Sequence, residues 1–391
     1  MTVIVSAART PVGKFGGVFK NLSAVDLGAL AVKEAVKRST LGPEDFNMAI
    51  LGQVLQAGCG QIPSRQVTAK AGLPETLPSE TINKVCASSF RAVTLADILI
   101  RSCEADAVIA GGMESMSNSP FAVPAMRWGQ RMFNTEMLDL MVHDGLWCAA
   151  YNRHMAVHGG VMAKEFGITR QEQDEWAYQS QMKAAAALKA GRLDEEIVPV
   201  TLQSKKGESV VSQDESPRPD TTLEGLARLP ALFDPENTVT AGNAPGTNDG
   251  ASAMVLMSDE MAEKRGLKPL ARIVGSAMVA DDPQRIATVP GQAINKLLKK
   301  TGMSINDIDL IEINEAFAAV TLVSGVICGC DMIRVNVNGG AVAFGHPIGA
   351  SGARIIMTLI YEMRRRKATW GVAAICSGAA QGDAILVKCD Y

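Results

Sequence analysis

Several classes of protein are disfavoured by what this chain lacks. Among 391 residues the net charge is only −3, so there is no basic excess of the kind that binds nucleic acid or acidic lipid. No apolar run reaches the roughly 20 residues that a membrane-spanning helix needs. The eight cysteines contain no Cys-x-x-Cys pair, and Cys328-Gly-Cys330 is too closely spaced for a usual zinc site. Neither end resembles a targeting signal, so we expect a cytoplasmic protein. We also expect neither a metal site nor a tightly bound cofactor.

Strand-like and helix-like segments alternate in the first third of the chain. Residues 3–7 and 48–55 read as buried strands, and a helix is expected from Ser23, its cap, to about Arg38. A further helix is expected over 87–101, followed by a short strand over 107–110. Such alternation predicts an α/β fold with mostly parallel strands.

The last third repeats this order. Residues 45–52 resemble 307–314, residues 87–91 resemble 350–354, and residues 107–110 resemble 371–374. Three echoes in one order indicate two similar halves. Halves of this kind usually pack about a pseudo-twofold axis, which would bring the helix after Cys86 close to the helix after His346.

The segment from 117 to 239 interrupts the pattern and reads as an insertion. It holds a strong helix, which begins with the capping box Thr169–Glu172 and ends near Gly191, and a polar stretch over 204–219 that we expect to be loop. We therefore divide the chain into 1–265, carrying the inserted loop domain 117–239, and 266–391.

His346 lies in a glycine-rich stretch, 336–354, that precedes a helical pattern. Glycines at this density indicate sharp turns or close approach to a ligand, and a helix start there points N–H groups at the loop. The alternative is a glycine-rich turn with an incidental histidine.

Three other residues are candidates for chemistry. Cys86 begins a predicted helix, where a thiol pKa is expected to fall. Cys376 ends an apolar strand, and Gly378 beside it could offer an N–H to an oxyanion. Asn314 ends a buried strand and is either functional or part of a structural network. Both cysteines could instead be buried structural thiols, and the spacing of His154 and His158 is compatible with a metal but has no third ligand.

Taken together, the motifs resemble those of the thiolase family over nearly the whole chain. The segments that carry the resemblance are 81–89, which contains Cys86, followed by 111–116, 241–250, 314–318, the His346 stretch and the Cys376 turn. The resemblance implies a five-layer α/β/α/β/α fold of two related halves with an inserted loop domain that holds coenzyme A. It also implies a homotetramer or homodimer.

The resemblance further implies a ping-pong mechanism. Cys86 would take the acyl group as a thioester, and His346 would accept its proton. Cys376 would remove a proton from the methyl carbon of a second acetyl-CoA. Asn314 would hold a water that forms one oxyanion hole with His346, while the N–H groups of Cys86 and Gly378 would form the other.

The residues expected to contact coenzyme A or the acyl group are the following: Arg218, Ala241, Ala244, Pro245, His154, Met155 and Phe317. The chain departs from the family pattern at Pro245, where serine is usual, at Ala379 and Ala380, where glycines are usual, and after Met155.

We expect this chain to condense two acetyl-CoA reversibly to acetoacetyl-CoA and coenzyme A. The alternatives are cleavage of longer 3-ketoacyl-CoA chains, a decarboxylating ketosynthase on the same architecture, and a catalytically silent acyl-CoA-binding protein. Retention of both thiols together with His346 and Asn314 argues against the last two.

Overall fold

The computed structural model describes every residue of the chain except 206. The first half contains β1 (Thr2–Arg9), β2 (Gly13–Lys14), α1 (Ala24–Ser39), β3 (Met48–Gly52), α2 (Pro63–Lys70), β4 (Ser79–Ile82), α3 (Ser88–Arg101), β5 (Ala107–Ser115), β12 (Asn248–Ser258) and α7 (Asp259–Lys264). The second half contains β13 (Ala271–Ala280), α8 (Val289–Thr301), β14 (Leu310–Ile313), α9 (Ala318–Cys328), α10 (Ala341–Phe344), α11 (Ser351–Arg366), β15 (Trp370–Ser377) and β16 (Gln381–Lys388).

The two halves have the same strand order, as the sequence echoes predict. In the first half the order is β3-β5-β12-β1, with β4 added beside β3 at the edge, and in the second it is β14-β15-β16-β13. Each order begins with a parallel pair and continues with two antiparallel pairs. The halves join where β1 pairs with β13 over three residues, from Thr2↔Ile273 to Ile4↔Ala271, so the sheet is continuous.

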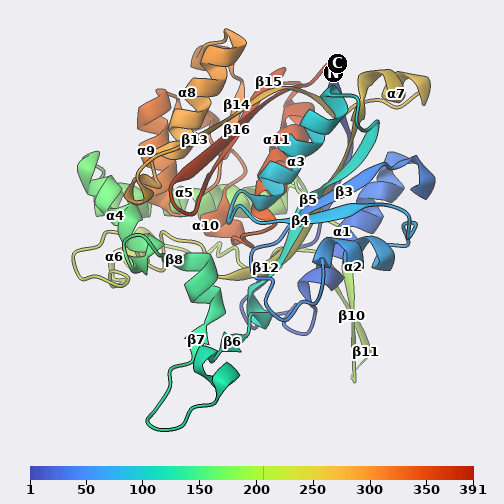
Figure 1. Cartoon of the computed structure of the whole chain (residues 1–391). Coiled ribbons are helices and arrows are strands. Elements are labelled where there is room, and N and C mark those ends of the chain that lie inside the picture. The colour runs from blue at the N-terminus through green and yellow to red at the C-terminus, as the bar shows by residue number, and fades with distance from the viewer. Residues whose placement is uncertain (206) are drawn as a thin grey trace.

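Helices cover both faces of each half of the sheet and complete five layers (Figure 1). Helices α1 and α2 pack on the outer face of the first half, and α8 and α9 pack on the outer face of the second. Helices α3 and α11 lie against each other between the two halves, in a core to which both contribute. The predicted five-layer α/β fold is therefore confirmed. The expectation of mostly parallel strands is wrong, because within the described sheet only β3–β4, β3–β5 and β14–β15 pair in parallel, whereas the pairs around β1, β12, β13 and β16 are antiparallel.

Helix starts follow the signals in the sequence. Ser23 accepts a hydrogen bond from the Asp26 N–H at 3.1 Å, while the Asp26 carboxylate accepts from the Ser23 N–H at 2.9 Å. Thr169 and Glu172 form the same reciprocal box at the start of α5 (Arg170–Lys189). These caps satisfy N–H groups that would otherwise lack partners.

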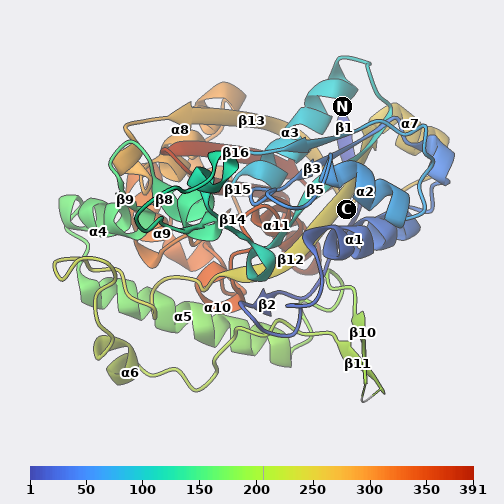
Figure 2. The same ribbon diagram turned by 60° about the horizontal axis from the view of Figure 1, so that its bottom comes forward.

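Residues 116–247 lie between β5 and β12 and cross one end of the sheet (Figure 2). This segment contains β6 (Phe121–Ala122), β7 (Leu138–Asp139), β8 (Trp147–Cys148), β9 (Arg153–His154), α4 (Met155–Glu165), α5, β10 (Val200–Ser204), β11 (Gly207–Val211) and α6 (Leu223–Ala227). The expectation of loop over 204–219 is wrong in part, because β10 and β11 form a hairpin; residue 206 lies outside the described residues. The boundaries 117–239 and 265/266 remain predictions.

None of the helices among the described residues is both long and apolar enough to cross a membrane.

Candidate active site

Cys86 lies in a tight turn between β4 and α3. The Ser88 hydroxyl donates to the Val85 carbonyl at 2.7 Å and accepts from the Lys84 N–H at 2.8 Å, and Asn83 Oδ1 accepts from the Val85 N–H at 2.9 Å. Val85 has a φ of 46°. A β-branched residue in this left-handed region is strained, and such strain persists only where surrounding contacts hold it. The nucleophile candidate is thus presented by a backbone conformation that its neighbours enforce.

His346 is held with its Nε2 atom free of hydrogen. Its Nδ1 lies 2.6 Å from the Ser351 Oγ, and the single hydroxyl hydrogen of Ser351 is donated to the Pro347 carbonyl at 2.8 Å. The hydroxyl oxygen must then accept from Nδ1–H, so Nε2 carries the lone pair. Ser351 is the first residue of α11, so the start of this helix supplies the hydroxyl group that orients the imidazole of His346.

Asn314 and Glu315 share one motif but differ in role. The Asn314 amide Nδ2 lies 3.5 Å from His346 Nε2, and its buried Oδ1 accepts no hydrogen bond from the described residues. Glu315 is fully buried and accepts four hydrogen bonds, from Trp176, Ser180, Asn336 and the Val342 N–H, each at 2.9 Å. Glu315 therefore forms the structural network, whereas Asn314 faces the imidazole.

Cys376 is the last residue but one of β15, which a hairpin connects to β16. The Ser377 hydroxyl donates to the Lys84 carbonyl, and a side chain at Gly378 would contact Val85 within 2.9 Å. The hairpin is therefore packed directly against the turn that presents Cys86.

The two alanines that depart from the family pattern, Ala379 and Ala380, complete the turn of this hairpin with φ of 57° and 48°. Both occupy the conformation that glycine adopts at no cost.

Burial dominates the acid–base properties of the site. It raises the pKa of the Cys86 thiol to about 12, with a smaller contribution from the carboxyl group of Glu114. The expectation that the helix start lowers this pKa is wrong, because desolvation of the thiolate outweighs the helix dipole. Burial, with the nearby Arg354 guanidinium, also lowers the pKa of His346 to about 3. The site at rest thus holds a neutral thiol and a neutral imidazole, and the imidazole can accept the thiol proton as the thiol attacks.

Cys376 is also kept neutral. Its pKa is raised well above that of an ordinary thiol, first by burial and then by the nearby Cys86. The two thiols therefore interact electrostatically, and only one of them can readily carry charge at a time.

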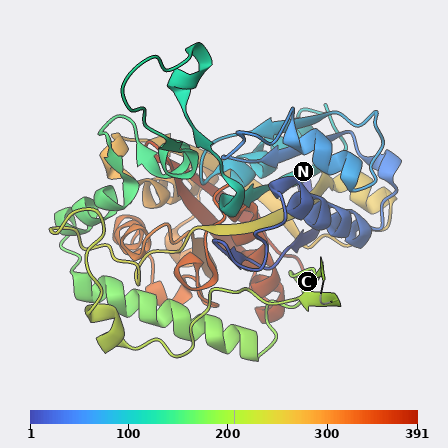
Figure 3. The same cartoon turned by 90° about the horizontal axis from the view of Figure 1, so that it is seen from below.

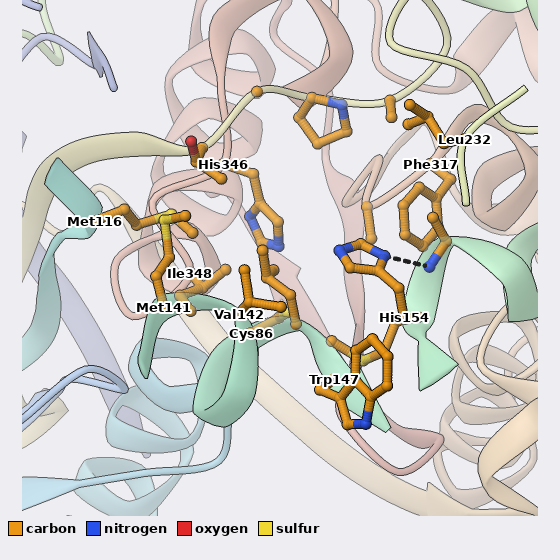
Figure 4. A pocket seen from close by; sticks show the side chains of 18 of the residues that line it. Cys86, Met116, Met141, Val142, Trp147, His154, Leu232, Phe317, His346 and Ile348 are labelled. Atoms are coloured by element: carbon orange, nitrogen blue, oxygen red, sulfur yellow. Dashed lines mark hydrogen bonds between the residues drawn. The ribbon is translucent and has the colours of Figure 1, made fainter. Parts of the chain in front are cut away.

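Cys86 and His346 line an apolar cavity of about 340 Å³ (Figure 4). Figure 4 shows the imidazoles of His346 and His154 projecting into it, with Trp147 at its edge. Its other walls are mainly apolar: Met116, Met141, Val142, Leu146, Met155, Ala156, Leu232, Phe233, Ala244, Pro245, Ile286, Ala316, Phe317 and Ile348. A cavity of this size with apolar walls can accommodate a short acyl chain bound as a thioester.

A second cavity of about 390 Å³ shares part of its wall with the first, including Leu232, Ala244 and Pro245. Arg218, Lys14 and Ala241 also line it. All seven predicted coenzyme A or acyl contacts therefore line one or both cavities. Asn314, Cys376 and Gly378 line neither cavity, although Asn314 contacts His346 and Gly378 contacts Val85, the residue before Cys86.

His154 and His158 do not converge on one ligand position. His154 caps α4 by accepting from the Ala156 N–H at 3.1 Å and stacks on Phe233 with ring centroids 3.9 Å apart. His158 Nδ1 lies 3.1 Å from Arg153 Nη2, which can only donate. Burial lowers the pKa of each imidazole to about 4. Among the described residues no group of three or more His, Cys, Asp or Glu side chains could hold a metal.

Sequence reasoning missed several residues that shape the site. Ser351 fixes the tautomer of His346. The only indication of this role in the sequence is that Ser351 lies five residues after the histidine. Glu114 is buried and accepts from the N–H groups of Val54, Leu55 and Gly349, at 3.1, 3.2 and 2.9 Å. It therefore fastens the His346 loop to the first half, and burial raises its pKa to about 7. Its motif, 111–116, belongs to the thiolase resemblance, but nothing in the local pattern indicates a role for this carboxylate.

Comparisons with known proteins agree with this geometry. The family model described as "Thiolase, N-terminal domain" matches residues 2–260, and "Thiolase, C-terminal domain" matches 267–389. The acetyl-CoA acetyltransferase of Thiocystis violacea is 49% identical over 99% of this chain and 98% of its own length. The Escherichia coli (strain K12) protein of the same name is 47% identical over the same shares. The crystal structure of the Bacillus anthracis acetyl-CoA acetyltransferase superposes with a TM-score of 0.97 at 41% identity, covering 99% of this chain and 98% of that one. The chain therefore belongs to the thiolase family.

Proposed function

We propose that this enzyme is an acetyl-CoA C-acetyltransferase that reversibly condenses two acetyl-CoA to acetoacetyl-CoA and coenzyme A. One observation carries the proposal: Cys86 and an imidazole whose Nε2 is free of hydrogen line one apolar cavity, which adjoins a second cavity lined by Arg218. The names of the similar proteins from Thiocystis violacea and Escherichia coli support acetyl over longer acyl chains.

In the first half-reaction Cys86 Sγ attacks the thioester carbonyl while His346 Nε2 takes the thiol proton. The N–H groups of Cys86 and Gly378 hold the oxyanion, and such a donor typically contributes about 3–4 kcal/mol. Coenzyme A leaves as a thiolate and can take the proton of the nearby Cys376. A thiolate is a stable leaving group, so departure and acetyl exchange do not require this transfer. The second half-reaction does require it, because the transfer forms the Cys376 thiolate that acts there as the base.

In the second half-reaction the Cys376 thiolate removes a proton from the methyl carbon of the incoming acetyl-CoA. Asn314 and His346 stabilise the enolate oxygen, with a water that the free Asn314 Oδ1 helps to hold. The carbanion attacks the acetyl group on Cys86, and the released Cys86 thiolate recovers its proton from His346. All protons taken in the first half-reaction are thereby returned.

Acetyl exchange between acetyl-CoA and labelled coenzyme A separates the two thiols, because exchange needs no carbon acid–base step. Cys376→Ser should keep much of the exchange and lose most of the condensation, whereas Cys86→Ser should lose both. Mass spectrometry after an acid quench should find one acetyl group on the Cys86 peptide. Equal loss of exchange and condensation in folded Cys376→Ser would overturn the role given to Cys376.

Acyl length is tested directly by cleavage of a series of 3-ketoacyl-CoA substrates of increasing chain length. Acetoacetyl-CoA should be cleaved fastest. A maximum at longer chains would favour the alternative 3-ketoacyl-CoA thiolase.

The proposal includes a homo-oligomer, either a tetramer or a dimer, and a cytoplasmic location. Residues 121–139 form an arm that projects from the body (Figure 3), and Trp128 and Phe133 on it are 90% and 89% exposed. Large apolar side chains gathered on a projection are typical of a binding surface. Light scattering of the wild type and of Trp128→Ser/Phe133→Ser tests the association, and cell fractionation tests the location.

A further inference from the structure

Lys84 and Asp383 form an ion pair that the chemistry described above does not use. Lys84 Nζ lies 2.6 Å from Asp383 Oδ2 and 2.9 Å from Oδ1. The carboxylate is 1% exposed and the lysine side chain 14% exposed. A buried pair of this kind contributes little net stability compared with apolar residues of the same volume, so its presence calls for another explanation.

The pair joins the elements that carry the two thiols. Lys84 lies two residues before Cys86, in the turn between β4 and α3. Asp383 lies on β16 beside Gly382, which pairs directly with Cys376 across the hairpin. Lys84 is thus two residues from Cys86, and Asp383 is one residue from the strand partner of Cys376. The two charged residues are nevertheless 299 residues apart in sequence.

Two further contacts join the same two segments. The Lys84 carbonyl accepts from the Ser377 hydroxyl, and Gly378 packs on Val85. Val85 is the residue with a φ of 46°, immediately before Cys86. Because strained backbone relaxes unless its surroundings hold it, loss of a contact on either side of Val85 would let the turn shift and carry Cys86 with it.

We infer that Lys84 and Asp383 are positioning residues that hold the strained Val85–Cys86 turn against the Cys376 hairpin and thereby set the separation of the two thiols. This inference rests on the proposed function. Condensation requires the enolate formed beside Cys376 to reach the acetyl group on Cys86, and a displacement near 1 Å is enough to lower such a rate about a hundredfold. Acetyl exchange shares the Gly378 N–H with the hairpin, but it needs neither the carbon acid–base step at Cys376 nor the approach of a second substrate to the acetyl group, so it should fall less than condensation.

The experiment compares condensation with acetyl exchange in Asp383→Asn and Lys84→Met, with Lys84→Arg as the conservative variant. Asp383→Asn keeps the size of the side chain and removes its charge. We expect the rate of condensation to fall at least tenfold in Asp383→Asn and Lys84→Met, while the rate of exchange falls less than threefold. Lys84→Arg, which keeps the positive charge, should retain most of the condensation. Lys84→Met/Asp383→Leu, which leaves no unpaired buried charge, should fold and show the same imbalance.

Asp97→Asn is the matched control. Asp97 pairs with Arg101 at 2.7 Å on α3, the helix that follows Cys86, but lies away from the hairpin. This variant should leave the ratio of condensation to exchange unchanged. Equal loss of both reactions in the Lys84 and Asp383 variants, or no loss of either, would refute the positioning role. Failure of the wild type to condense acetyl-CoA would instead refute the proposed function.

Discussion

Replacing Ala379 with glycine should stabilise this enzyme, although removal of a methyl group from a folded protein usually does not. Ala379 has a φ of 57° and its side chain is exposed, so glycine loses almost no buried surface there. The left-handed conformation costs an alanine about 1–2 kcal/mol. Glycine avoids that cost. It also gives the unfolded chain more conformational freedom, which lowers the stability of the folded state by about 0.4–1 kcal/mol. The net stabilisation is therefore about 0.5–1 kcal/mol.

The neighbouring Ala380 provides an internal comparison. Its φ is 48°, but it is fully buried, so glycine there also loses a methyl contact that contributes about 0.8 kcal/mol. The two effects should cancel. Ala186, exposed within α5, is the opposite control, because glycine in a helix interior costs about 1 kcal/mol.

Thermal unfolding followed by circular dichroism measures these differences. For 391 residues the unfolding entropy is about 0.8 kcal/mol/K, so 1 kcal/mol shifts Tm by about 1 °C. Ala379→Gly should raise Tm by about 0.5–1 °C, Ala380→Gly should leave it unchanged, and Ala186→Gly should lower it by about 1 °C. A drop for Ala379→Gly as large as that for Ala186→Gly would contradict the conclusion that the hairpin turn is strained.

Three further predictions address binding, acidity and packing. Arg218→Ala should raise the KM for acetyl-CoA with little change in kcat, and should not affect a short acetyl thioester without the nucleotide; unchanged KM would make Arg218 a solvated loop residue. The pKa of Cys86 is raised to about 12, so the fraction of thiolate should increase about tenfold per pH unit from pH 7 to 10. The rate of alkylation by iodoacetamide, followed by peptide mass spectrometry, should increase in the same way. A plateau of this rate near pH 8 would contradict the raised pKa. Glu315→Ala leaves four buried donors unpaired and should cost at least about 3 kcal/mol in denaturant unfolding, against about 1 kcal/mol for the exposed capping residue Glu172→Ala.

Local signals in the sequence were sufficient for the helix starts and for the repeat. Ser23 and Thr169 each precede an acidic residue by three positions, and both capping boxes form because their hydrogen bonds are local. The echoes between 45–52 and 307–314 correspond to β3 and β14, which hold equivalent places in the two halves. Periodicity and capping are properties of neighbouring residues, so the sequence displays them directly.

Properties that depend on the surroundings in three dimensions could not be predicted in the same way. A helix start after Cys86 favours a low thiol pKa, but the degree of burial decides the sign, and burial depends on residues from both halves. The tautomer of His346 depends on the Ser351 hydroxyl and the Pro347 carbonyl together. Likewise, no local pattern pairs Lys84 with Asp383 across 299 residues.

The meeting of α3 and α11 in the middle layer has a consequence for how the catalytic work is divided. The Ser89 hydroxyl accepts from the Ala353 N–H at 3.0 Å, and a methyl group on Gly352 would overlap Phe90. Two helices in equivalent places thus begin side by side, yet one follows the thiol and the other follows the histidine. The equivalent places of the two helices thus put two similar frames around one centre, with Cys86 before one helix and His346 before the other. In the proposed mechanism neither half contains a complete reaction centre by itself, so the activity would depend on the contact between the two halves.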